Sequence, residues 1–177
     1  MPQAIYQIDS AHSSAQFTVR HLMISNVRGE FTKVSGSITY GPAGAADASI
    51  DATIDAASIN TREAQRDAHL KSADFFDVAQ FPALTFRSKA IAAHDGEWDV
   101  TGDLTIHGVT REVVLRVEGP TPETKDPWGN MRIGATATAK INRKDFGLTW
   151  NAALEAGGVM VGEEVKITID LEAIRQG

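Results

Sequence analysis

The feature that most constrains the fold of this 177-residue chain is a two-residue alternation of apolar and polar side chains along most of its length. In the last such segment, apolar side chains take every second position from Val165 to Leu171, with polar ones between them. Successive side chains of a β-strand point to opposite faces, so each segment predicts a strand with one buried and one solvated face. Antiparallel sheets have this pattern.

Similar segments predict a series of long strands. The expected strands cover residues 4–9, 14–23, 27–40, 47–58, 83–94, 97–107, 111–119, 131–141 and 165–173. Closure is favoured for so long a sheet, because it alone removes the unpaired edges. We therefore expect a single domain over residues 1–177, an all-β antiparallel barrel of about eight strands with one inserted α-helix.

Local signals indicate how the strands connect. Asp95-Gly96 predicts a tight hairpin, because both residue types tolerate positive φ. Phe31 is out of phase with Val34 in the alternation, which predicts a β-bulge at Thr32–Lys33.

One helix is predicted after Asn60, which we expect to cap it, with Glu63 completing a capping box. Phe75, Phe76 and Phe81 follow this helix in a short loop. Their rings would either form an apolar lid over one mouth of the barrel or plug that end permanently.

The inward face of the predicted barrel is rich in small residues. Ala135, Ala137 and Ala139 take successive apolar positions of one strand, and Gly102 lies in the middle of another. A barrel of about eight strands is just wide enough for its own side chains or for one small ligand. The pattern therefore has two interpretations. One is an elongated apolar tunnel, and the other is a barrel filled by aromatic rings that acts as a scaffold through its outer surface.

Composition excludes several classes of function. The formal net charge is −6 without any basic run, so we expect no nucleic-acid partner. The absence of cysteine excludes disulfides, thiolate nucleophiles and zinc–thiolate sites. The first residues lack the pattern of a secretory signal, and no apolar stretch approaches the ~20 residues of a spanning helix. We expect a cytoplasmic protein, or a periplasmic one if an export signal has been removed.

Few side chains suggest catalysis. Asp9, His12 and Ser13 are neighbours in one turn, whereas a catalytic triad needs groups that converge in space beside an oxyanion hole. His12, His21 and His69 would converge on a metal if the helix covered the end of the first long strand, which supports an alternative hypothesis of a metal-dependent enzyme or sensor. Histidines that face solvent or have hydrogen-bond partners are the more frequent case. We therefore expect no catalytic residues, no metal and no other cofactor.

Short motifs that span almost the whole chain point to a known family. They are Tyr6-x-Ile8-Asp9, His12-Ser13-Ser14, Phe17-x-Val19-x-His21, Val27-Arg28-Gly29-x-Phe31, Arg66-Asp67-x-His69-Leu70, Asp74-Phe75-Phe76-Asp77, Phe81-Pro82, Gly102-Asp103-Leu104-Thr105-Ile106-x-Gly108-Val109-Thr110, Asn142-Arg143-x-Asp145-Phe146-Gly147-Leu148-x-Trp150 and Val161-Gly162-x-Glu164-Val165. In this order, from about Tyr6 to Ile174, they resemble the YceI-like family of polyisoprenoid-binding or lipid-binding proteins.

This resemblance implies a lipocalin-like barrel whose tunnel holds a long lipid chain, without catalytic residues. It predicts non-enzymatic binding, storage or transport of a polyisoprenoid such as a polyprenol or an isoprenoid quinone, with a fatty acid or fatty amide as the alternative ligand. The expected partners are this lipid, a transiently contacted membrane and a second copy in a homodimer, since isologous dimers are the commonest oligomers. The residues expected to line the tunnel are Phe17, Val19, Ile38, Ile54, Leu70, Phe76, Phe86, Trp98, Leu104, Ile106, Ile133, Ala137 and Trp150.

Overall fold

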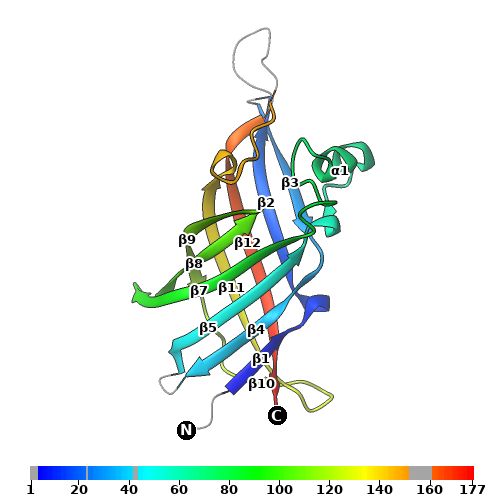
Figure 1. The fold of residues 1–177 in the computed structure, drawn as a ribbon. Helices are drawn as coiled ribbons and strands as arrows, with labels where there is room; N and C mark the ends of the chain where they lie inside the picture. Colours follow the sequence, from blue (N-terminus) through cyan, green and yellow to red (C-terminus); the bar gives the residue numbers. More distant parts are fainter. Residues whose placement is uncertain (1–3, 23, 42–43, 152–160) are drawn as a thin grey trace.

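The computed structural model describes residues 4–22, 24–41, 44–151 and 161–177. Its strands form an elongated antiparallel barrel, and one α-helix, α1 (Ala64–Lys71), lies beside the end of the barrel that is farther from the C-terminus (Figure 1). None of the helices in these ranges is long and apolar enough to cross a bilayer.

The strands occupy most of the chain. They are β1 (Ala4–Ile8), β2 (Ser14–His21), β3 (Ser25–Phe31), β4 (Val34–Gly41), β5 (Gly44–Asp55), β6 (Ile59–Asn60), β7 (Ala83–His94), β8 (Glu97–Ile106), β9 (Val109–Glu118), β10 (Thr124–Lys125), β11 (Met131–Asn142) and β12 (Val161–Gln176). Short 3-10 helices are η1 (Ser10–His12), η2 (Ala56–Ser58) and η3 (Arg143–Phe146). Residue 23, the expected end of the second strand, lies outside the described residues.

Strand pairing closes the sheet into a barrel. The order around the barrel is β11-β9-β8-β7-β5-β4-β1-β12, and β12 pairs back onto β11. The 16 residues of β12 reach beyond a single neighbour, so that one part of its free edge pairs with β2 and another with β1. The hairpin of β2 and β3 therefore continues the wall that β1 and β4 begin. The closed eight-stranded antiparallel barrel with one helix is confirmed.

The irregularity expected at Thr32–Lys33 is present, but it separates two strands, β3 and β4, where one was predicted. Ser58 Oγ accepts the N–H of Thr32 at 3.1 Å and that of Lys33 at 3.2 Å. A side chain thus replaces the ladder hydrogen bonds at the point where the strand changes direction.

The predicted hairpin is confirmed, whereas the predicted helix cap is wrong. Asp95 and Gly96 join β7 to β8 with φ values of 50° and 79°. The N-cap of α1 is Glu63, whose carboxylate accepts the N–H of Arg66 at 2.6 Å. Asn60 instead accepts the N–H of Arg62, which has a φ of 68°, so the chain makes one more turn before the helix begins.

Gly102 does not contribute open space to the interior. A Cβ added at Gly102 would lie 2.5 Å from Cζ of Phe86, so the phenylalanine ring already occupies that volume. The interpretation of this glycine as part of a tunnel is therefore wrong, because a neighbouring aromatic side chain fills the gap.

Candidate ligand-binding cavity

A cavity of about 290 Å³ lies inside the barrel, and nearly all of its wall is apolar. One side of it is formed by alternate residues of β12, including Val165, Ile167 and Ile169. This arrangement follows from the alternation in the sequence, which places every second side chain on the inner face. Ala135 and Ala137 of β11 face the same space, so these small residues leave room that no other side chain fills.

Most residues predicted to line a tunnel border this cavity. They are Phe17, Val19, Ile38, Ile54, Leu70, Phe76, Phe86, Leu104, Ile106, Ala137 and Trp150. The other two, Trp98 and Ile133, border a smaller apolar cavity of about 60 Å³. Contact between these side chains and a ligand stays a prediction.

The two cavities are separate volumes along one interior wall. Side chains that border both are Ile38, Ile50, Val117, Ala135 and Leu171. The smaller cavity also borders Tyr40, whose hydroxyl is buried and has no hydrogen-bond partner among the described residues. Burial raises the pKa of the Tyr40 hydroxyl. The next tyrosine ring, Tyr6, lies 5.0 Å away and donates its own hydroxyl to Glu123.

The aromatic segment after α1 contributes two rings to the larger cavity. Phe75 and Phe76 border it, and the ring of Phe76 packs edge-on against Phe31 with centroids 5.5 Å apart. Phe81 packs instead against His107, 4.8 Å between ring centroids, and is not among the described lining residues. The action of Phe75 and Phe76 as a movable lid stays a prediction.

Basic residues, three arginines and two histidines, interrupt the apolar lining. Arg20, His21, Arg66, His69 and Arg143 border the larger cavity, and no aspartate or glutamate occurs among its described lining residues. Arg20 was missed as a lining residue because strand alternation marks only apolar positions, and Arg66 because it lies on α1, outside the alternating segments. The one available signal was the family motif, which contains Arg66 and His69.

Arg66 is held in a defined orientation by Thr61. Its Nε donates to Thr61 Oγ1 and its Nη2 to the Thr61 carbonyl, both at 2.8 Å. Thr61 is only 4% exposed, and its own N–H and hydroxyl donate to Asp67 Oδ1. The capping turn therefore positions the guanidinium before any ligand arrives.

Arg143 is 3% exposed, and among the described residues its guanidinium donates only to main-chain carbonyls. Its acceptors, at 2.6–3.1 Å, are the carbonyl oxygens of Leu148, Trp150, Val161 and Gly162. Burial lowers the pKa of the Arg143 guanidinium, although arginine stays protonated in proteins.

The three histidines proposed for a metal site do not converge. His12 precedes β2 and His21 is the last residue of that strand, so nearly the whole length of β2 separates them. His69, on α1, pairs through Nε2 with Asp74 Oδ2 at 2.8 Å. The geometry therefore contradicts a metal centre built from His12, His21 and His69.

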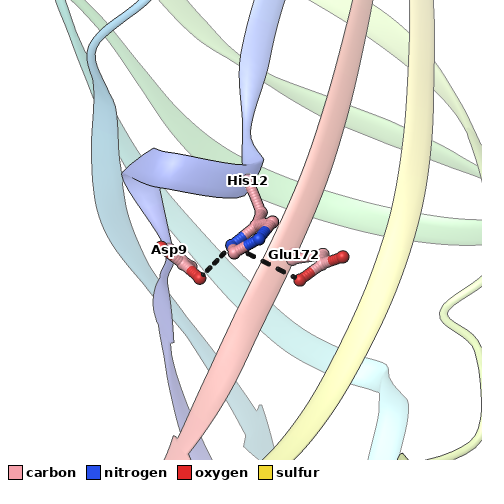
Figure 2. A group of neighbouring side chains, drawn as sticks. All are labelled: Asp9, His12 and Glu172. Carbon is pink, nitrogen blue, oxygen red and sulfur yellow. Dashed lines mark hydrogen bonds and ion pairs between the residues drawn. The ribbon is translucent and has the colours of Figure 1, made fainter. Parts of the chain in front are cut away.

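Among the described residues, one other group brings metal-ligand types together: Asp9, His12 and Glu172, whose ligand atoms lie within 4.8 Å of one another (Figure 2). His12 Nδ1 lies 2.7 Å from Asp9 Oδ2 and 4.0 Å from Glu172 Oε2. Arg132 Nη1 approaches the same two carboxylates at 2.7 and 3.2 Å, and its Nε binds Asp126 Oδ2 at 2.7 Å.

The guanidinium of Arg132 thus already supplies positive charge to this group. Its hydrogen bonds hold the pKa of Asp9 below the usual value and lower that of Asp126 to about 2. We assign the group a structural role, tying together η1, β11, β12 and the turn before β11.

A closed β-barrel with an apolar internal cavity defines the class of this protein, and similarity to known proteins defines the family. A family model described as YceI-like domain matches residues 6–173. A UPF0312 protein of Staphylococcus aureus strain N315 is 38% identical over 167 residues, covering 94% of this chain and 95% of that protein. The chain therefore belongs to the YceI-like family, as its motifs predicted.

Solved structures share the fold. The YCEI protein of Campylobacter jejuni has a TM-score of 0.72 at 34% identity, covering 89% of this chain and 90% of that one. BcnA of Burkholderia cenocepacia has a TM-score of 0.77 at 26% identity, covering 93% and 98%. A polyisoprenoid binding domain from Saccharophagus degradans has a TM-score of 0.69 at 19% identity, covering 97% and 98%, and is similar in fold alone.

Proposed function

We propose that this protein binds a long-chain apolar lipid inside its barrel, with a polyisoprenoid as the first candidate and a fatty acid or fatty amide as the alternative. The observation that carries the proposal is the apolar cavity of about 290 Å³, bordered by side chains from most of the barrel strands. A cavity in a protein interior costs stability unless something occupies it, and apolar cavities exclude water. The Saccharophagus domain, described as polyisoprenoid binding, supports the same class of ligand.

The free energy of moving a lipid chain between a membrane and the barrel suits a protein that carries or stores lipid. Each buried CH₂ group contributes roughly 0.8 kcal/mol relative to water, so ten such groups give about 8 kcal/mol. The relevant competitor is the lipid bilayer, where the chain is already out of water. Transfer from the membrane to the barrel is then nearly neutral in free energy, which permits both loading and release.

The composition of the wall supports a non-enzymatic role as part of this proposal. The described lining contains no aspartate, glutamate or serine, and the chain has no cysteine. The side chains that usually serve as nucleophiles or carboxylate bases in acyl and glycosyl transfer are therefore missing from the described part of the cavity. Binding without turnover accounts for the cavity as it stands.

Native mass spectrometry of freshly purified protein, followed by solvent extraction of the ligand, tests the proposal. We expect an added mass that corresponds to one prenyl or acyl lipid per chain. Protein that is ligand-free after purification, and stays so after incubation with polyprenols, quinones and fatty acids, would contradict lipid binding and favour a scaffold that acts through its outer surface.

A further inference from the structure

Arginines on the outer wall and arginines of the cavity differ in their partners. On the outer wall, Arg87 pairs with Asp51 at 2.9 Å, and Arg116 pairs with Asp99 at 2.8 Å. Arg66 borders the cavity, and no carboxylate lies within ion-pair distance of its guanidinium anywhere in the described part of the chain.

The described wall of the cavity thus contains arginines and no carboxylate, although the chain as a whole has a net charge of −6. Acidic side chains are more numerous than basic ones overall, so chance placement would bring some of them to the wall. Half-buried charges are normally compensated, because the transfer of a charge from water is costly without a counter-ion.

Arg66 is built to make one further contact. Its Nε and Nη2 both donate hydrogen bonds to Thr61 at 2.8 Å, while its Nη1 has no hydrogen-bond partner among the described residues. Guanidinium donors form a planar fork that matches the oxygens of carboxylate and phosphate groups. Because Thr61 and Asp67 fix the orientation of this fork, little side-chain entropy is lost when an anion binds.

Arg143 adds positive charge to the same wall. Its carbonyl acceptors satisfy its hydrogen bonds but carry no net charge to neutralise it. The charge of Glu163 acts on this second guanidinium, but no carboxylate forms an ion pair with it among the described residues, so it adds to the preference of the cavity for an anion.

We propose that the lipid carries an anionic head group, a carboxylate or a phosphate, and that Arg66 binds this head group while the apolar chain fills the cavity. This inference rests on the proposed function, since it specifies the ligand of the same cavity.

Matched pairs of lipids test the head group in the unmodified protein. We would measure dissociation constants for hexadecanoic acid against hexadecanol, and for geranylgeranyl phosphate against geranylgeraniol. Because a charge-assisted hydrogen bond is about twice as strong as a neutral one, we expect at least one anion to bind about tenfold or more tightly than its alcohol. The pair with the larger ratio of dissociation constants, alcohol over anion, identifies carboxylate or phosphate as the preferred head group.

Substitutions then test whether Arg66 causes the preference for the anionic lipid over the alcohol. We expect Arg66→Gln to lower affinity for the preferred anion about tenfold and to leave affinity for the alcohol unchanged. Arg66→Lys keeps the charge and should retain part of the preference. Lys71→Gln is the matched control, because it removes one positive charge from the same helix at a position that does not border the cavity.

The outcomes separate this inference from the proposed function. If neither acids nor alcohols bind, the proposed lipid-binding function fails. If acids and alcohols bind equally, or if Lys71→Gln reduces anion affinity as much as Arg66→Gln, lipid binding stands and the anionic head group at Arg66 is rejected. Circular dichroism and thermal melting of each variant show whether it has folded.

Discussion

Two arginine environments in this barrel show how the same side chain serves structure in one place and binding in another. Arg132, 19% exposed, lies on the outer wall among three carboxylates, those of Asp9, Asp126 and Glu172. Arg66 lies at the cavity, and its guanidinium has only Thr61 as a partner among the described residues. The first guanidinium has its counter-ions built into the fold, whereas the second has a fixed orientation and an unused donor.

The comparison teaches which charges to associate with a ligand. Asp9, His12 and Glu172 resemble a metal site, because two carboxylates and a histidine lie close together. The guanidinium of Arg132 already provides the positive charge there. A cation that borders an apolar cavity without a carboxylate is the opposite case. Outer-wall changes should therefore alter stability, and inner-wall changes should alter binding.

The largest effect is expected from Ala137→Trp, which places a bulky ring in the cavity. The Ala137 side chain borders open space, so the ring can enter the cavity, and lipid affinity should fall by about 100-fold or more. Lipid loading is measured by native mass spectrometry. The neighbouring substitution Thr138→Trp, on the exposed face of β11, is the control. Equal loading of Ala137→Trp and the wild type would reject the cavity as the binding site.

A second test removes the charge at the centre of the outer cluster. Arg132→Gln leaves three carboxylates close together without their guanidinium, so we expect the Tm to fall by several degrees while lipid affinity is unchanged. Arg87→Gln, which breaks one exposed pair, should change stability by no more than about 1 kcal/mol. If Arg132→Gln folds but no longer binds lipid, the claim that outer-wall arginines serve stability and cavity arginines serve binding is rejected.

A third test asks whether a buried hydroxyl without a hydrogen-bond partner only lowers stability or also contacts the ligand. The Tyr40 hydroxyl is buried without a partner in the described structure. We expect Tyr40→Phe to raise the free energy of unfolding by about 1 kcal/mol, because it removes a buried hydroxyl that has no hydrogen bond among the described residues. Tyr6→Phe loses the bond to Glu123 and should lower it. Chemical denaturation measures both, and weaker lipid affinity in Tyr40→Phe would instead make this hydroxyl a ligand contact.

The smallest effect concerns acid. The hydrogen bond from Arg132 lowers the pKa of Asp126 from the usual 3.8 to about 2 in the folded protein. A depressed folded pKa contributes stability that is present above pH 3.8 and is lost as the pH falls toward 2. Thermal melts between pH 5 and pH 2 should show this loss. Asp126→Asn should have a shallower acid dependence, and an identical dependence in both proteins would exclude this pair as its source.

Local patterns in the chain were sufficient for most of the architecture. The alternation along β11 and β12 identified which side chains face inward, because a strand offers only two faces. Asp95-Gly96 specified its hairpin through backbone preference alone. The cap of α1 was misplaced because Asn60 is a favoured N-cap residue and Glu63 is not, whereas Arg62 has a positive φ in the structure and the helix begins only after Glu63.

The sequence by itself determined a closed antiparallel barrel, its inward face and its family, because these depend on short-range periodicity and on motifs in a fixed order. Only the tertiary structure decided that Phe86 fills the space at Gly102 while the space at Ala137 stays open, since this depends on which side chains meet across the barrel. It also decided that Arg132 meets Asp9, 123 positions away, while the guanidinium of Arg66 meets no carboxylate among the described residues. Charge pairing between distant segments follows from strand register and closure, which no local pattern encodes.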